Sequence, residues 1–433
     1  MDGTTRRAVL LGGAALAAGA TSDARAQTPA GKMRISWWGS DDRHQRTLKI
    51  IKLWEARNPG MTLTPEYGGF LGYQDKLSTE FAGRNAPDIM QIADNRESLI
   101  ASGRLLLLDD YVASGKFDLS SANPGVLETV KVNHKLYGVP WGLATGCFFL
   151  DTKLFADAKT ELPGPDWTWD EYARKATAIA KGLPKGMYGS ADIWAPAGTR
   201  SLYGLEFFIR QRGLTAFTPD GKLGFGKNEL TEWFTFWDDL RRAGAVPPAE
   251  VTALENGFET SPVIAGRAAM YPVNSSIASS LQALAKNKLV VATFPNGIGS
   301  KALSGPQYGQ FINSSLQVYI NADTKYKPLA VDFLNAITND PEMAKIQLMS
   351  RGVPLSAKIT DLIMPDIAPV EQSMTEVIRF VQAHATKLFV AWPKAGTQIQ
   401  DLMQRSHQQI AFGQASIKDT VTRFFDDAGL IVE

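Results

Sequence analysis

Cysteine and histidine are scarce in this chain. Its 433 residues include a single cysteine, Cys147, and four histidines that stand far apart. One cysteine excludes an internal disulfide, and the apolar residues 148–150 that follow it predict a buried structural thiol. Because the sequence contains no Cys/His cluster and no His-Glu-x-x-His motif, it predicts no metal site and no cofactor.

A surplus of charge of either sign is also absent. The 45 basic and 44 acidic side chains leave a formal net charge of +1. Such a chain has no general electrostatic field that would attract nucleic acid or an anionic membrane surface. We therefore expect no nucleic-acid partner.

Long apolar runs are missing beyond the N-terminus, so no stable insertion into a membrane is expected. The N-terminus carries the pair Arg6-Arg7, the apolar segment 8–20 and small residues on either side of Arg25, which is typical of a cleaved export signal over residues 1–26. The arginine pair favours the twin-arginine route over an ordinary secretory signal. Because no cysteine lies near the cleavage site, we expect a free periplasmic protein without a lipid anchor.

Motifs for nucleotide binding and nucleophilic catalysis are incomplete or missing. Segment 221–228 nearly matches a phosphate-binding loop, but Asn228 stands where Ser or Thr is required, and Asp220-Gly221 predicts a hairpin turn. The sequence also contains no Gly-x-Ser-x-Gly motif. We predict a protein that is not an enzyme. An exported polysaccharide hydrolase or lyase, with a carboxylate pair or a base in its cleft, stays open as the alternative.

Strand and helix patterns alternate along the chain. Alternating apolar residues predict strands near 33–37, 61–66 and 88–93, each followed by a helical pattern. This order predicts an α/β fold with a parallel sheet, whose ligands lie beyond the carboxyl ends of the strands. The length of the chain predicts two lobes. Further along, we expect an extended segment at 139–150, strands at 290–295 and 316–321, and helices at 171–181, 202–212, 230–242, 257–270, 281–285, 328–338, 398–412 and 418–428.

Several short motifs resemble those of a known family, the extracellular solute-binding proteins of sugar ATP-binding-cassette (ABC) importers, which includes maltose-binding protein. The motifs keep their order and spacing across nearly the whole mature chain and lie at residues 35–39, 81–83, 86–89, 136–140, 167–171, 266–270 and 327–334. The segments 37–39, 43–44 and 69–73 resemble a subgroup that binds oligosaccharides, some of them acidic, although Phe70 stands where that motif often has Trp.

The resemblance implies a two-lobed periplasmic-binding-protein fold. Each lobe is expected to hold a mainly parallel sheet flanked by helices, with the ligand cleft between them. The first lobe would comprise residues 32–139 and 306–355, and the second 140–305 and 356–433. A monomer that closes about a hinge is expected, with a sugar as ligand and the transmembrane subunits of an ABC permease as partner. A binder of a non-sugar solute is a further alternative.

Binding a sugar requires short polar side chains for its hydroxyl groups and flat aromatic rings for its C–H faces. In the first lobe, Ser40, Asp41 and His44 cluster at a predicted helix start, where free backbone N–H groups also point outward. Helix capping is the alternative role for Asp41. The other first-lobe candidates are Tyr73, Asp94 and Asn95.

The second lobe and the crossings between lobes provide further candidates. Each has an ordinary structural alternative, such as hinge packing for Trp141 or a capped turn for residues 274–276. The candidates are Trp141, Trp194, Tyr271, Asn274, Ser275, Ser276, Gln310, Ser314 and Trp392. Arg351, near the last crossing, is a candidate to pair with a carboxylate, sulfonate or phosphate on the ligand, and Arg43 offers the same chemistry; an anionic sugar is the less favoured hypothesis. An ion pair on the surface or between the lobes is the alternative for both arginines.

Overall fold

A computed structural model describes most of the mature chain. The described residues are 30–69, 72–92, 96–195, 201–298, 301–302, 308–312, 316–384, 392–393 and 395–432. The predicted signal segment, residues 1–26, lies outside them, as do the candidates Asp94, Asn95 and Ser314.

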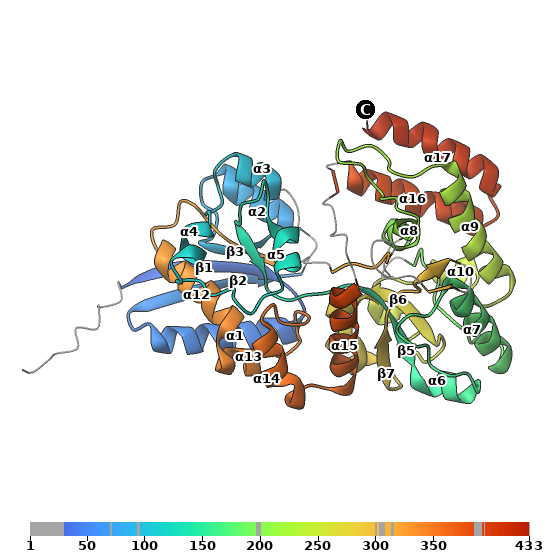
Figure 1. Cartoon of the computed structure of the whole chain (residues 1–433), viewed down its shortest axis with the longest axis horizontal. Helices are drawn as coiled ribbons and strands as arrows, with labels where there is room; N and C mark the ends of the chain where they lie inside the picture. The colour runs from blue at the N-terminus through green and yellow to red at the C-terminus, as the bar shows by residue number, and fades with distance from the viewer. Residues whose placement is uncertain are drawn as a thin grey trace, which may run out of the picture.

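The first lobe is built on a five-stranded sheet in the order β2-β1-β3-β10-β4 (Figure 1). As predicted, β1 pairs in parallel with both β2 and β3, whereas β10 runs antiparallel to β3 and β4. The strands are β1 (Gly31–Trp38), β2 (Met61–Gly68), β3 (Ile89–Ile92), β4 (Gly138–Pro140) and β10 (Gln317–Ile320).

Helices cover this sheet. In α1, Ile50, Ile51 and Trp54 recur at helical spacing and are buried, and the indole N–H of Trp54 donates to Asp332 in α12 at 2.8 Å. The helices are α1 (Asp41–Arg57), α2 (Tyr73–Ala82), α3 (Arg96–Ala101), α4 (Asp109–Ala113), α5 (Pro124–Val130), α12 (Lys327–Asn339), α13 (Pro341–Gln347) and α14 (Ala357–Ile363), which the short helix η4 (Met364–Asp366) follows. Helix α14 lies beyond residue 355, where the first lobe was expected to end, and it packs against α13.

The second lobe has a three-stranded sheet in the order β6-β5-β7, with β5 (Gly146–Asp151), β6 (Met270–Asn274) and β7 (Leu289–Ala292). We expected a mainly parallel sheet here, but β5 is antiparallel to both neighbours. The reason lies in the connections: β6 and β7 form a crossover through α11 (Ala278–Leu284), and β5 enters between them in the opposite direction. Cys147 in β5 is fully buried, as predicted.

Helices also surround the second sheet, and Thr168 caps α7 by accepting a hydrogen bond from the Glu171 N–H, as predicted. Segment 217–223 forms the predicted hairpin turn. The remaining elements are α6 (Thr152–Asp157), α7 (Trp169–Gly182), α8 (Ser201–Arg210), α9 (Lys227–Arg242), α10 (Ala249–Thr252), η1 (Phe258–Thr260), η2 (Ser275–Ile277), α15 (Pro369–His384), α16 (Gly396–Ala411), α17 (Ile417–Val432) and the hairpin β8 (Gly297–Ile298)–β9 (Lys301–Ala302).

The helix predicted over 257–270 is wrong. This segment contains the short helix η1 and turns, and it ends at the start of β6. Gly257 and Gly266 adopt φ values of 101° and 65°, which a helix does not allow, and Pro262 lies between them.

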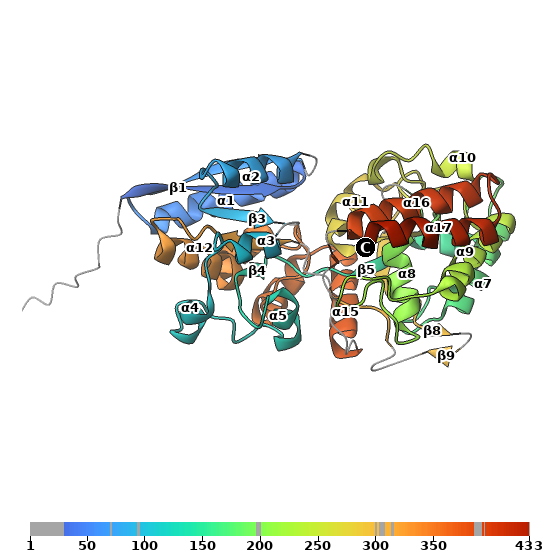
Figure 2. The same cartoon turned by 90° about the horizontal axis from the view of Figure 1, so that it is seen from above.

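Chain crossings join the lobes at a narrow waist (Figures 1 and 2). Residues 141–145 lead from β4 in the first sheet to β5 in the second. There, Leu143 and Val353 exchange backbone hydrogen bonds of 2.6 and 3.0 Å. Across the described ranges, no helix combines the length and apolar character that crossing a bilayer would need.

Candidate functional site

The carboxyl ends of β1 and β2 present an aromatic cluster, made of Trp37, His44 and Tyr67. Trp37 and Tyr67 are paired in register, and their rings stack with centroids 5.1 Å apart. The His44 ring lies 4.4 Å from that of Tyr67. Trp37 is fully buried, but 47% of Tyr67 is exposed, so Tyr67 is the member of the cluster that a ligand can reach.

His44 is held in one protonation state by its neighbours. The indole N–H of Trp37 donates to His44 Nδ1 at 3.1 Å, which leaves the ring proton of the neutral imidazole on Nε2. Burial, with help from the positive charges of Arg351 and Arg43, lowers the pKa of His44. At neutral pH the ring is therefore a neutral hydrogen-bond donor beside the aromatic face.

The start of α1 supplies polar groups next to this cluster. Ser40 is the N-cap residue, yet its hydroxyl makes no capping hydrogen bond, and the side chain is exposed. Asp41 is exposed as well and is approached by Gln45 at 3.5 Å. The side chains of Ser40 and Asp41 are thus exposed and keep oxygen atoms available to accept hydrogen bonds from a ligand.

Two arginines lie between the lobes. Arg43, on α1, donates from Nη2 to the Ser276 carbonyl of the second lobe at 2.9 Å and from Nε to the Ser350 carbonyl at 2.6 Å. Burial lowers the pKa of Arg43 to about 10. Arg351 is 1% exposed, and burial lowers its pKa too, with a contribution from Arg43. Because Arg43 binds the carbonyl of Ser350, the residue that precedes Arg351, the two arginines are neighbours.

The groups that Arg351 contacts through its guanidinium are neutral. Its guanidinium lies 3.8 Å above the ring of Trp141 and donates to Gln91 Oε1 at 3.1 Å and to Thr47 Oγ1 at 2.9 Å. Tyr73, 6% exposed, donates its hydroxyl to the Gln91 carbonyl at 3.1 Å. Trp141, Tyr73 and Arg351 are thus brought together, as a buried layer behind the open groups of α1.

The short helix η2 is the part of the second lobe that lies opposite α1. Asn274 caps η2 by accepting from the Ser276 N–H at 2.9 Å, and the buried Ser275 hydroxyl accepts from the Thr145 N–H at 3.1 Å. Gln310, 2% exposed, binds the backbone of Gly146 and Phe294. The side chains of Asn274, Ser275 and Gln310 thus stabilise the crossing between the lobes. Ser276 lies where the lobes meet, because its carbonyl accepts the hydrogen bond from Arg43.

Trp194 and Tyr271 lie inside the second lobe, where both are fully buried. Near Tyr271 is Glu255, 5% exposed, whose two carboxylate oxygens have no hydrogen-bond partner in the described part of the chain. Burial raises the pKa of Glu255 to about 8, and the charge of Asp192 adds to the shift. Trp392 is half-buried beside Tyr203, with ring centroids 4.5 Å apart.

Sequence reasoning missed Tyr67, Gln91 and Glu255. Tyr67 carries a usable signal, because it ends the second strand in register with Trp37. Nothing local in the sequence marks Gln91 or Glu255, since their importance comes from burial.

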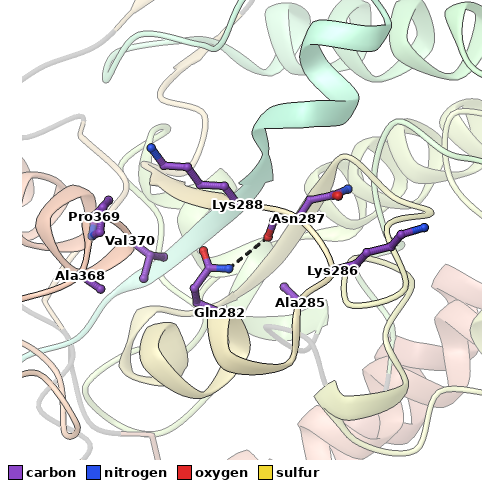
Figure 3. A pocket seen from close by; sticks show the side chains of 8 residues that line it. All are labelled: Gln282, Ala285, Lys286, Asn287, Lys288, Ala368, Pro369 and Val370. Atoms are coloured by element: carbon purple, nitrogen blue, oxygen red, sulfur yellow. Dashed lines mark hydrogen bonds between the residues drawn. The ribbon is translucent and has the colours of Figure 1, made fainter.

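An open hollow of about 470 Å³ lies elsewhere on the second lobe, between the start of β7 and the start of α15 (Figure 3). There Gln282 Nε2 donates to the Asn287 carbonyl at 3.1 Å. The hollow is lined by Gln282, Ala285, Lys286, Asn287, Lys288, Ala368, Pro369 and Val370, and none of the predicted ligand residues is among them. Within the described ranges, no group of His, Cys, Asp and Glu side chains is arranged to hold a metal ion.

Comparison with known proteins agrees with this architecture. An extracellular solute-binding protein family 1 structure from Alicyclobacillus acidocaldarius is 26% identical, with a TM-score of 0.75, and the match covers 94% of this chain and 99% of that one. A periplasmic oligogalacturonide binding protein from Yersinia enterocolitica, in complex with saturated digalacturonic acid, is 22% identical with a TM-score of 0.75, over 92% of this chain and 98% of that one.

Another relative is an uncharacterized lipoprotein of Streptomyces antibioticus, 24% identical over 72% of this chain and 67% of its own. The model of the family described as bacterial extracellular solute-binding protein matches residues 41–344, well over half of the sequence. This chain therefore belongs to the bacterial extracellular solute-binding protein family.

Proposed function

We propose that this protein is the substrate-binding component of an ABC importer, which captures a sugar or sugar derivative between its lobes and delivers it to the permease. The observation that carries the proposal is the aromatic cluster at the strand ends, beside the exposed Ser40 and Asp41. A flat ring and short polar groups at one edge match the C–H face and the hydroxyl groups of a sugar. The oligogalacturonide binding in the Yersinia protein supports this ligand class.

Closure about the waist is the proposed mechanism. The crossing at residues 141–145 would act as hinge, and the lobes would be those expected from the resemblance, except that α14 and η4 belong with the first lobe. Closure brings η2 towards α1, and the hydrogen bond from Arg43 to Ser276 already spans this gap. Removing water from the closed cleft would strengthen each polar contact with the sugar. A monomer is sufficient for this cycle.

Assay of purified protein with oligosaccharides separates a binder from the alternative hydrolase or lyase. We expect a sugar to raise the melting temperature without any product, because a ligand that binds only the folded state stabilises it. Product formation would overturn the proposal. Stabilisation by amino acids or polyamines alone would show a binder of another class.

Replacing Tyr67 with alanine should weaken sugar binding about tenfold, because a stacked ring contributes roughly 1 kcal/mol or more. Calorimetric titration gives the dissociation constants. Tyr67→Phe keeps the ring and should bind nearly as the wild type does. Phe412→Ala, which removes a similarly exposed ring at the end of α16, is the control for general effects. Equal affinity of Tyr67→Ala and wild type would remove the aromatic cluster from the site.

We propose export with cleavage after Ala26, by the twin-arginine route, and a mature protein free in the periplasm. The arginine pair supports the route, and the lack of a cysteine near residue 26 supports the free state. The Streptomyces relative is named a lipoprotein, so the chemical state of the mature N-terminus distinguishes a free protein from a lipid-anchored one. Mass spectrometry of the exported protein should find an unmodified chain that begins at Gln27, and a lipid-modified terminus would contradict this.

A further inference from the structure

Among the described residues, which do not include Asp94, the two interlobe arginines have no salt-bridge partner. Within the described part of the chain, no carboxylate lies within ion-pair distance of Arg43 or Arg351, although other arginines are paired: Arg46 binds Asp42 at 2.8 Å, and the largely buried Arg241 binds Asp192 at 2.6 Å. The hydrogen-bond acceptors of Arg43 and Arg351 are backbone carbonyls, an amide and a hydroxyl. The half-buried Arg43 and the fully buried Arg351 thus donate their hydrogen bonds to neutral acceptors, although the charge of Asp42 also acts on Arg43.

The surroundings of Arg351 also have more hydrogen-bond donors than acceptors. The amide nitrogen Nε2 of Gln91 and the indole Nε1 of Trp141 are buried, and neither has an acceptor among the residues that the structure describes. Gln91 is fully buried, and Trp141 is 4% exposed. Each nitrogen belongs to a side chain that already contacts the Arg351 guanidinium through its oxygen or its ring.

Such a cluster is costly unless something completes it. A buried charge without a partner destabilises a fold by several kcal/mol, and an orphaned donor by roughly 1–3 kcal/mol. An anion with several acceptor oxygens would supply both the missing counter-charge and the missing hydrogen-bond acceptors. The planar fork of a guanidinium matches a carboxylate in particular, through two parallel hydrogen bonds.

We propose that the ligand carries an oxyanion, a sugar carboxylate in the first instance, which binds beside Arg43 and Arg351 at the junction of the lobes. The proposal rests on the proposed function and narrows its ligand to acidic sugars. Arg43 is the accessible member of the pair, since opening the lobes would break its hydrogen bond to Ser276 and free Nη2. Arg351 supplies a fixed charge behind it, held by Gln91, Thr47 and Trp141.

Matched pairs of sugars test this charge requirement by calorimetry. The probes are galacturonic acid with galactose, digalacturonic acid with galactobiose, glucuronic acid with glucose, and glucose 6-phosphate for the phosphate alternative. We expect an acidic sugar to bind at least tenfold more tightly than its neutral partner. The neutral sugar lacks at least one charge-assisted hydrogen bond, which changes the affinity by about that factor. Preference for glucose 6-phosphate alone would keep the oxyanion site and replace the carboxylate.

Arginine variants test which side chains cause the preference for acidic sugars. Arg43→Gln should weaken binding of the acidic sugar about tenfold or more and leave weak binding of the neutral partner unchanged. Arg351→Lys keeps the charge but loses the fork, so we expect an intermediate loss. Arg46→Gln, one helical turn further along α1 and already paired with Asp42, is the control and should bind as the wild type does.

The outcomes separate this inference from the proposed function. Equal affinity for neutral and acidic sugars, or Arg43→Gln with wild-type preference for the acid, would overturn the anionic ligand and leave a sugar binder. Binding of acetate or inorganic phosphate as tight as that of the sugar acids would keep the oxyanion site but overturn the sugar-binding function. A panel in which no acidic sugar binds would overturn the inference.

Discussion

Replacing Gly142 with alanine should destabilise the protein by about 3 kcal/mol and weaken ligand binding. A Cβ at this position would lie 2.2 Å from the carbonyl oxygen of Arg351 and 2.7 Å from its carbon, both of them backbone atoms of the neighbouring crossing. The two crossings would have to separate, which breaks the paired hydrogen bonds between Leu143 and Val353. Overpacking costs about 1–3 kcal/mol, and each lost hydrogen bond about 1 kcal/mol.

Thermal and urea unfolding measure the loss, and Gly429→Ala is the control. Gly429 lies in α17, where an added Cβ meets no atom within 4 Å. Alanine there should stabilise the protein by up to about 1 kcal/mol through helix propensity. If Gly142→Ala behaves like Gly429→Ala, the close approach of the crossings is not a constraint on the fold.

Replacing Glu255 with glutamine should stabilise the protein at alkaline pH. The carboxyl group is buried without a hydrogen-bond partner, and burial raises its pKa to about 8 from an ordinary value of 4.5. The folded state therefore holds a proton that the unfolded state has released. The stability due to this proton is complete below pH 4.5 and is lost as the pH rises through 8. With roughly 1.4 kcal/mol for each pKa unit, the shift from 4.5 to about 8 corresponds to a loss of the order of 5 kcal/mol.

The glutamine side chain has similar size and cannot ionise, so the variant should escape this loss. We expect its melting temperature to exceed that of the wild type by about 5 °C at pH 9 and to differ little at pH 5. Glu250→Gln, at an exposed position on α10, should show no such pH-dependent difference. A constant difference between Glu255→Gln and wild type from pH 5 to 9 would mean that Glu255 is ionised in the folded protein throughout.

Much of the first lobe can be predicted from the sequence because its signals are local. The alternation of Met33, Ile35 and Trp37 predicts β1, and the spacing of Ile51 and Trp54 predicts α1; both elements are present. The position of Ser40 and Asp41 at the strand-to-helix turn follows from the same pattern. Their exposed state in the structure is consistent with the role predicted for them.

The second lobe is harder to predict because its decisive constraints are long-range. The direction of β5 depends on strands more than a hundred residues away, and no local pattern distinguishes a parallel from an antiparallel neighbour. Apolar residues between 257 and 270 suggest a helix, but glycine conformations and the buried strand β6 prevent it. The neutral surroundings of Arg351 exist only after β3, α1 and the hinge come together.

A crystal structure with the tightest-binding acidic sugar is the most direct test of the account. We predict the sugar ring on the face formed by Tyr67 and His44, with its carboxylate at Arg43 and Arg351 and with η2 closed over it. A sugar bound wholly within one lobe, or in the hollow beside Lys286 and Lys288, would contradict capture between the lobes.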